Sequence, residues 1–213
     1  MTKKIADAHL QTLGMTGTTW NFFVAAVNLF SIHGYANVSI RDIASTLNIK
    51  AASMYNHFDS KDALLVKIYD FCQYHFDNIT ANLDGLVEIV PKTPPQKVFD
   101  KYLSCFGDEI YGQGLLGLMP KVLKIVLEES TRDKRAEKLA NILYNQYPNQ
   151  YLKPILQKMI ELGQIKPIDV NLFITLYSSF EMNCSRAQGS KLAISGVHWK
   201  KCRKFLFSLI QTN

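Results

Sequence analysis

Hydrogen-bonding and positively charged side chains gather in one short stretch of the sequence, between residues 39 and 61. They include Ser39, Arg41, Lys50, Ser53, Tyr55, Asn56, His57 and Lys61. Side chains of these types bind phosphate oxygens and the edges of bases. The sequence has no GxSxG, HExxH or P-loop motif and no cluster at metal-ligand spacing. We therefore expect a contact with nucleic acid, and neither an enzyme nor a bound cofactor or metal.

Two short helices joined by a tight turn are predicted to position these side chains. Ser39 is expected to cap the first helix, with Asp42 three residues later completing a capping box. The second helix is expected over about residues 50–57. Apolar side chains would lock the pair together: Ile43, Ala44, Leu47, Ile49, Met54 and Phe58. This is a helix-turn-helix, whose second helix enters the major groove of DNA.

The rest of the chain has helical spacing as well. Apolar positions predict a first helix from about Thr18 to His33, stopped by Gly34. A long helix capped by Asp59 or Ser60 follows the helix-turn-helix. Further helices are predicted after Pro94 and at about 119–129, 132–146, 149–162, 168–186 and 197–211, with boundaries blurred by Pro148 and Pro154. No run of alternating strands is found, so the predicted fold is all-α, with about nine to ten helices.

The charge and composition restrict the class of protein. The 213 residues carry a net charge of +6 and are 47% hydrophobic, as in ordinary globular proteins. The whole positive excess lies in the last 32 residues, and residues 1–80 are neutral overall. The sequence contains no secretory signal and no apolar run long enough to span a bilayer. Its four cysteines are far apart, which favours reduced thiols in a cytoplasmic protein.

Three segments of the helix-turn-helix region carry a specific resemblance. They read FSIHGY at 30–35, SIRDIA at 39–44 and MYNHFDSKDAL at 54–64. Together they resemble the DNA-binding region of the tetracycline-repressor (TetR) family of bacterial regulators. The resemblance implies an N-terminal arm at 1–17, a DNA-binding domain at 18–66, a connecting helix at about 60–83 and a ligand-binding and dimerisation domain at 67–213. It also implies a homodimer that binds double-stranded operator DNA.

The resemblance assigns roles within the helix-turn-helix. Ser39 and Arg41 would touch the DNA backbone or a base edge, and Lys61 would hold a phosphate. The second helix would contact bases and phosphates through Ser53, Tyr55, Asn56 and His57. The sequence departs from the family pattern in three places: Asn48 replaces a turn glycine, Lys50 replaces a capping residue, and Ala51-Ala52 replace larger or turn-forming residues. The two alanines favour contact with thymine methyl groups. The alternative is that Tyr55 and His57 are packing residues and that Lys61 is a solvated charge.

Large apolar side chains in the C-terminal region are candidates for core or for a ligand pocket. They are Phe99, Tyr102, Cys105, Phe106, Met119, Leu123, Tyr151, Ile155, Met159, Phe173, Tyr177 and Phe180, with Asn183 as a further polar group. Such a pocket would favour a hydrophobic ligand. The candidates for the dimer interface are Trp199, Cys202, Leu206, Leu209 and Ile210, and the neighbouring cations, Arg203 among them, are expected at its rim or in solvent.

A glycine-rich segment offers a competing interpretation. Gly112, Gly114 and Gly117 match the form of a dinucleotide-binding loop, but such a loop follows a strand and opens a helix. Since a helical pattern precedes this segment, we expect a connector between helices.

The resulting hypothesis is a repressor that a small, mostly hydrophobic effector releases from a palindromic operator. One alternative is a regulator or activator controlled by a protein partner without a small molecule, which a filled core in residues 95–213 would support. The other is a helical enzyme or lipid carrier. Absence of salt-dependent DNA binding would exclude the regulator.

Overall fold

The regular elements that the structure describes are helical, as the sequence predicts. The computed structural model describes residues 14–81, 83–102, 115–187 and 196–212. In the first half the helices are α2 (Gly17–His33), η1 (Tyr35–Asn37), α3 (Ile40–Thr46), η2 (Ala51–Asn56), α4 (Lys61–Ala81), α5 (Leu86–Ile89), η3 (Val90–Lys92) and a helix at 95–102. In the second half they are η4 (Leu115–Leu118), α7 (Met119–Glu129), α8 (Lys134–Asn141), η5 (Ile142–Gln146), η6 (Pro148–Leu152), α9 (Lys153–Glu161), α10 (Val170–Arg186) and α11 (Gly196–Ser208).

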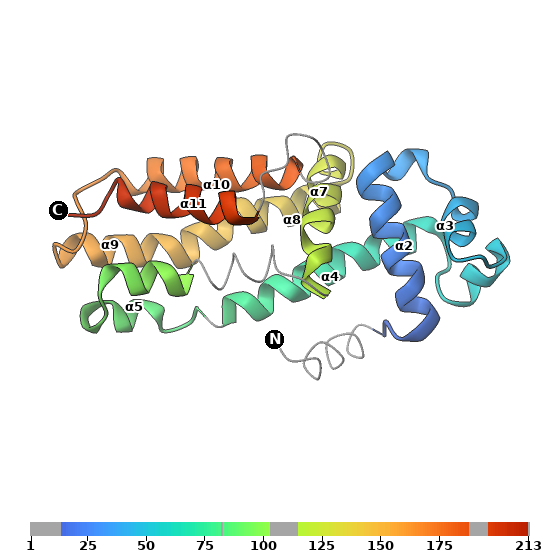
Figure 1. The fold of residues 1–213 in the computed structure, drawn as a ribbon, viewed down its shortest axis with the longest axis horizontal. Helices are drawn as coiled ribbons and strands as arrows, with labels where there is room; N and C mark the ends of the chain where they lie inside the picture. The colour runs from blue at the N-terminus through green and yellow to red at the C-terminus, as the bar shows by residue number, and fades with distance from the viewer. Residues whose placement is uncertain (1–13, 82, 103–114, 188–195, 213) are drawn as a thin grey trace.

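The molecule is elongated, with the helix-turn-helix at one end (Figure 1). We call α2, η1, α3, η2 and the first turns of α4 the head. Helix α4 runs out of the head along the body of the molecule, which contains α5 and α8–α11. Helix α7 stands between the two parts and packs against α2 on one side and α10 on the other. Two helices, α4 and α7, therefore connect the head to the body mechanically.

The core of the head is built from apolar side chains at helical spacing. Phe22, Phe23 and Phe30 on α2 are completely buried, and Met54 of η2 packs into the same cluster. Trp20 stacks on Phe23, with ring centroids 5.3 Å apart. Burial of such large side chains contributes about 2–3 kcal/mol each before the loss of conformational entropy is counted. The predicted first helix is thus confirmed, and its apolar face holds the head together.

Pro148 and Pro154 do not interrupt the helical backbone in which they lie. Separate helices over 132–146 and 149–162 were expected, but α8, η5, η6 and α9 follow one another directly from Lys134 to Glu161. The turns η5 and η6 are π-helical. A proline lacks an N–H and crowds the carbonyl four residues earlier, and the wider π turn relieves both effects. The expectation that a proline ends a helix failed here because it takes no account of this widening of the turn.

Helices α10 and α11 run antiparallel and are joined by aromatic and ionic contacts. The ring of Phe207 lies 5.8 Å from that of Phe173 and 6.0 Å from that of Tyr177. Nearer the start of α11, Nε of Arg203 donates to Glu181 over 2.5 Å, and both side chains are buried. The expectation that Arg203 lies at an exposed rim is therefore wrong, because a buried carboxylate one helix away pairs with it.

Candidate nucleic-acid interface

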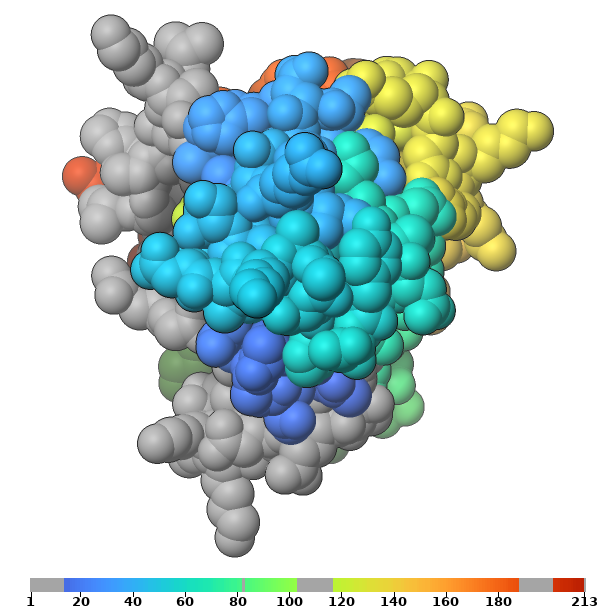
Figure 2. Space-filling view, turned by 90° about the vertical axis from the view of Figure 1, so that its right-hand side faces the viewer, coloured from blue at the N-terminus to red at the C-terminus, as the bar shows by residue number. Residues whose placement is uncertain are grey.

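An open groove of about 770 Å³ crosses the outer surface of the head. Figure 2 looks onto this end of the molecule, where residues of the head form the surface that faces the viewer. The groove lies between the start of α3 and the start of η2. Its lining residues are Ala36, Asn37, Val38, Ser39, Ile40, Arg41, Ala51, Ala52, Tyr55 and Lys61. The structure thus brings together five of the predicted DNA-binding residues, namely Ser39, Arg41, Ala51, Tyr55 and Lys61.

The capping box predicted at Ser39 is present and fixes the start of α3. The Asp42 backbone N–H donates to Ser39 Oγ over 3.2 Å, and the Ser39 N–H donates to Asp42 Oδ2 over 2.7 Å. The Ser39 hydroxyl also donates to Asp42 Oδ2. These bonds to Ser39 hold the pKa of the Asp42 carboxyl below its ordinary value. The Ser39 side chain is therefore committed to orienting α3, and Arg41 beside it projects into solvent.

The turn between α3 and η2 depends on Asn48. Its φ of 55° lies in the left-handed region, which asparagine tolerates better than most residues. This confirms that the turn survives without the family's glycine. Beyond the turn, Lys50 is exposed and makes no side-chain cap, and η2 is a 3₁₀ helix.

The two sides of η2 have opposite environments. Met54 is completely buried and Phe58 is 7% exposed, while Tyr55 is 57% exposed and lines the groove. Inward packing of Met54 and Phe58 is confirmed, and packing inside the head is not the role of Tyr55. Its exposed position on the wall of an open groove makes the ring and hydroxyl of Tyr55 available to another molecule.

Asn56 and His57 are exposed but do not line the groove. The His57 ring lies 5.6 Å from the ring of Phe22, and its Nδ1 is 2.9 Å from Thr19 Oγ1. His57 therefore joins η2 to the start of α2. Ser53 is half-buried and also lies outside the groove lining.

Lys61 is half-buried and makes specific contacts within the head. Its Nζ donates to the carbonyl oxygens of Tyr35 and Val38, over 3.0 Å and 2.9 Å. It also lies 4.1 Å from the centre of the Tyr35 ring, a cation–π distance. The interpretation of Lys61 as a freely solvated charge is therefore wrong, because two carbonyls and an aromatic face enclose it.

Asn37 lines the groove but was not among the predicted residues. Its side-chain Nδ2 donates to the carbonyl of His33 at the end of α2. The sequence could have indicated Asn37, because it lies two residues before the N-cap Ser39 and so next to the start of a helix that approaches DNA. The groove as a whole depends on contacts between segments that no sequence pattern specifies.

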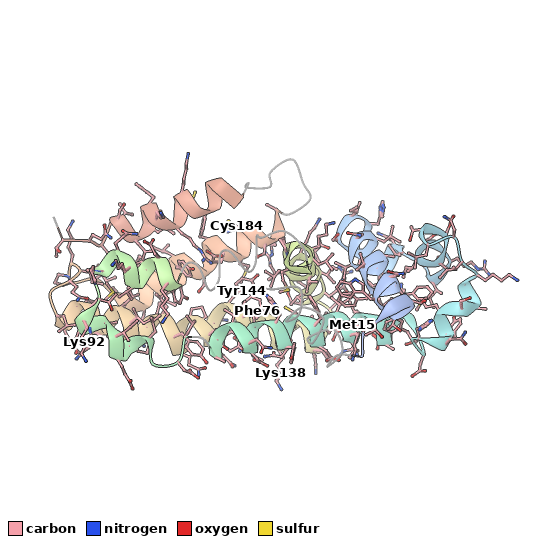
Figure 3. The ribbon with its side chains drawn as sticks, turned by 60° about the horizontal axis from the view of Figure 1, so that its bottom comes forward. Met15, Phe76, Lys92, Lys138, Tyr144 and Cys184 are labelled. Atoms are coloured by element: carbon pink, nitrogen blue, oxygen red, sulfur yellow. The ribbon has the colours of Figure 1, made fainter. Side chains whose placement is uncertain are left out.

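A second feature, in the body of the molecule, is a small buried cavity of about 30 Å³. This is room for about two water molecules. Its lining residues are Phe76, Tyr102, Leu123, Leu143, Tyr144, Pro148, Tyr177, Ser178, Glu181, Ser185 and Arg203. Figure 3 shows Phe76 of α4 and Tyr144 of η5 close together in the interior. The Tyr144 hydroxyl donates to Ser185 Oγ over 2.9 Å, and burial raises the pKa of Tyr144 well above its ordinary value.

Three of the predicted pocket residues, Tyr102, Leu123 and Tyr177, line this cavity. Cys105 and Phe106 lie outside the described residues. The other predicted pocket residues line other parts of the structure: Phe99, Met119, Ile155 and Met159 are buried in the core, Tyr151 and Phe173 are half-buried, and Phe180 lies on an outer groove. Asn183 is exposed and does not line the cavity. Sequence reasoning missed the polar residues of α10, although Ser178, Glu181 and Ser185 repeat at helical spacing.

The outer faces of α10 and α11 carry exposed apolar side chains. Leu172, Leu176, Phe205 and Leu209 are each more than half exposed. A shallow groove of about 400 Å³ lies beside them, lined by Phe180, Lys201, Cys202, Phe205 and Leu206. We call this surface the α10–α11 face.

Three of the predicted dimer residues, Cys202, Leu206 and Leu209, are at least partly exposed, as is Phe205, which was not among the predicted residues. Ile210 is buried, so its assignment to an interface is wrong. Helix α11 ends at Ser208, and the Ile210 carbonyl accepts from the Lys166 N–H inside the same chain. The side chain of Trp199 lies outside the described residues.

The groove, its helix-turn-helix and the separate helical body together define a class: helix-turn-helix DNA-binding proteins with an N-terminal head. Residues 22–68 match the family model described as bacterial regulatory proteins, tetR family. This match covers the helix-turn-helix region and not the body of the chain.

A curated relative matches the same region. Over 54 residues the chain is 43% identical to the biofilm operon icaADBC HTH-type negative transcriptional regulator IcaR of Staphylococcus aureus (strain Newman). The match covers 25% of this chain and 29% of IcaR, so the chain spans less than a third of the length of that relative. The body of the molecule has no counterpart in this match.

Solved structures share the fold over nearly the whole chain. The ketosteroid transcriptional regulator KstR2 of Mycobacterium tuberculosis superposes with a TM-score of 0.69 at 17% identity, covering 93% of this chain and 97% of that one. A putative transcriptional regulator from Saccharomonospora viridis in complex with choline gives a TM-score of 0.65 at 23% identity, covering 91% and 97%. The predicted all-α fold, with a head and a larger helical body, is confirmed.

Two further properties concern only the described residues. None of the helices there has the length and apolar character needed to cross a membrane. Nor do the described residues contain three or more His, Cys, Asp or Glu side chains grouped so as to hold a metal ion.

Proposed function

We propose that this protein is a transcriptional regulator that binds operator DNA through the groove of its head and, as a homodimer, represses transcription. The observation that carries the proposal is the groove itself, in which Tyr55 and Arg41 face solvent on a TetR-family DNA-binding domain. The negative regulator IcaR matches this domain, which supports repression over activation. A protein that acts on a bacterial chromosome would lie in the cytoplasm.

The contacts to DNA follow from the positions of the side chains. Arg41 and Lys50 are exposed on either side of the turn and would bind phosphates. Tyr55, with the methyl groups of Ala51 and Ala52, would meet base edges and thymine methyl groups in the major groove. Asn56 and Ser53 would reach the flanking phosphates.

Two residues of the head have a more structural part in this proposal. His57 would approach the DNA backbone beside the start of α2, where Thr19 holds its ring. Lys61 gives two of its three N–H groups to carbonyls, which leaves one for a phosphate. Ser39 would act mainly by fixing the start of α3, through its capping box.

The dimer would form through the α10–α11 face. Its exposed leucines and phenylalanine lie on or next to two adjacent helices, and clustered exposed apolar side chains often mark a contact between proteins. A two-fold dimer would present two heads about 34–36 Å apart, one turn of DNA, to a palindromic operator. Sedimentation of the purified chain tests this directly: a monomer at micromolar concentration contradicts it.

A small, mostly hydrophobic effector is proposed to act at the buried cavity. Pockets for small ligands have volumes of about 300–1,000 Å³, so a ligand must enlarge a cavity of about 30 Å³. Phe76 lies on α4 and Leu123 on α7, the two helices that connect to the head. Enlarging the cavity would displace these helices and bias the head toward a position that does not fit the operator.

The small volume of the cavity also favours a second candidate, a DNA-binding regulator or activator controlled by a protein partner. The two candidates differ in one measurable property. A small hydrophobic effector would raise the melting temperature of the purified protein and lower its affinity for DNA. If neither change occurs across a broad panel of small apolar compounds, the partner-controlled regulator is the better account.

DNA binding is tested by selection from a random duplex library with the purified protein. We expect enrichment of a palindrome whose half-sites lie about one helical turn apart. Affinity for this selected duplex should fall steeply as salt is raised. Failure to enrich any duplex, at low salt and with intact dimer, would contradict the proposed function and leave the helical enzyme or lipid carrier.

A further inference from the structure

The first turn of α4 carries two adjacent side chains that reach into different parts of the molecule. Lys61 donates to the carbonyls of Tyr35 and Val38, and Val38 directly precedes the N-cap of α3. Asp62 accepts from Arg135 in α8, from Nη1 over 3.1 Å and from Nη2 over 2.9 Å. The first turn of α4 thus contacts both a wall of the groove in the head and helix α8 of the body.

The Arg135 guanidinium is held by a second carboxylate. Its Nε donates to Asp133 Oδ1 over 3.0 Å, and its Nη2 donates to Asp133 Oδ2 over 2.7 Å. Asp133 is itself fixed as the N-cap of α8, where it accepts from the Arg135 backbone N–H, and Tyr69 of α4 donates to it over 3.3 Å. Both carboxyls have pKa values below their ordinary range because of Arg135. Paired contacts to two carboxylates fix a planar guanidinium in orientation as well as in place.

We propose that Arg135 is a positioning residue for DNA recognition, an inference that rests on the proposed function. It fixes Asp62, the neighbouring Lys61 fixes the segment before α3, and the groove is thereby held in a set orientation to the body. In a dimer joined through the body, two heads must meet two half-sites at once. Orientational freedom of each head is lost on binding, so a tie that removes this freedom beforehand raises the affinity for the operator.

The exposure of these side chains separates this role from a contribution to folding. The side chain of Arg135 is 49% exposed and that of Asp62 is 55% exposed. Exposed ion pairs add little to the free energy of unfolding, while a planar pair with fixed geometry still restricts rotation. On the far side of the head, Lys121 of α7 donates to Asn28 of α2 over 2.5 Å, and α2 packs on α7. Arg135 therefore adds a polar anchor to a head that already packs on α7 and continues into the body through α4.

Arg135→Gln and Asp62→Asn test the proposal, alone and combined, with the duplex obtained by selection as the probe. Each single variant should weaken binding about two- to fivefold per head, and about four- to 25-fold in a dimer that carries the change twice. The double variant should be no weaker than the singles, because both remove one contact. The charge swap Asp62→Arg with Arg135→Asp should recover most of the affinity, and Arg135→Lys, which lacks the planar fork, only part of it.

Lys138 provides the matched control. It lies three residues after Arg135 on the same helix, α8, and its side chain is exposed. Lys138→Gln removes one positive charge from α8 and leaves the contacts of Arg135 with Asp62 in place, so its affinity for the duplex should equal that of the wild type. Equal affinity of wild type and Arg135→Gln, or an equal loss in Lys138→Gln, would overturn the proposal.

Hydrogen exchange separates this proposal from the proposed function. Amides of residues 61–69 should exchange faster in Arg135→Gln than in the wild type, while the melting temperature and the oligomeric state stay the same. If the wild type binds no duplex, the proposed function fails, and the exchange result still decides whether Arg135 holds the head. Unchanged exchange at 61–69 contradicts the positioning role.

Discussion

The head and the body of this protein use positive charge in opposite ways. In the head, Arg41 and Lys50 are exposed beside a groove, although residues 1–80 are neutral overall. In the body, which carries the whole excess of +6 in its last 32 residues, Arg203 is buried against Glu181. The place of a charge therefore says more about DNA binding than the sum of charges.

The largest expected effect, on the free energy of unfolding, comes from breaking the buried Arg203–Glu181 pair of the body. Arg203→Met alone leaves the Glu181 carboxylate buried without its cation and should lower the free energy of unfolding by about 3–5 kcal/mol. Arg203→Met combined with Glu181→Leu should recover most of that loss, since no charge remains buried. Urea unfolding at one fixed protein concentration measures both. A double variant as unstable as the single one would mean that the pair is not what stabilises this site.

The next largest effect concerns the affinity of the head for DNA, with no expected change in the stability of the protein. Tyr55→Ala should weaken binding to the selected duplex by about 10- to 100-fold, the range for loss of a base contact. Because Tyr55 is largely exposed, the free energy of unfolding should change by less than about 0.5 kcal/mol. Ile32→Ala removes another exposed apolar side chain of the head, outside the groove, and serves as the control. A similar loss of affinity in both variants would refute the assignment of Tyr55.

A smaller effect concerns the local order of the head. Ser39→Ala removes the N-cap of α3 and should lower the free energy of unfolding of the head by about 1 kcal/mol. Trp20 stacks on Phe23 of the same helix and also contacts Phe71 of α4. In a Trp199→Phe variant, the fluorescence of Trp20 therefore reports on the folding of the head. Ser39→Thr retains a capping hydroxyl and should recover most of the loss. If Ser39→Ala and its parent unfold at the same temperature, as followed by the fluorescence of Trp20, the capping box does not stabilise the head.

The smallest effect is a dependence on pH in the same capping box. Bonds from Ser39 depress the pKa of Asp42, so its contribution to stability is present above the unfolded-state pKa. That contribution is lost as the pH falls through the depressed pKa of the folded state. Asp42→Asn should therefore lose less stability than the parent between pH 6 and pH 3, measured by Trp20 fluorescence. Parallel pH profiles would show that the Asp42 carboxylate is not selectively stabilised by folding.

The head was predictable from sequence because its determinants are local. Ser39 and Asp42 lie three residues apart, Met54 and Phe58 four, and each spacing specifies one turn of helix. Asn48 in a left-handed conformation followed from the tolerance of asparagine. What could not be predicted is the pairing of Lys61 with the carbonyls of Tyr35 and Val38, because backbone acceptors leave no pattern in the sequence.

The body was less predictable because its contacts join distant parts of the chain. Arg203 and Glu181 are 22 residues apart, and Arg135 and Asp62 are 73 apart. Helical spacing predicted α7 and α10 well, since amphipathic periodicity is a local property. It could not tell which of many apolar residues border a cavity, because that depends on how seven elements pack together.

The dependence of duplex binding on salt tests the central claim most directly. With Arg41 and Lys50 as the main phosphate contacts of two heads, the slope of log K against log salt should lie between about −3 and −6. Arg41→Gln or Lys50→Gln should each reduce its magnitude by about 1.8, while Arg186→Gln with Lys204→Gln should leave it unchanged. A slope that depends on Arg186 and Lys204, and not on Arg41 and Lys50, would contradict the account.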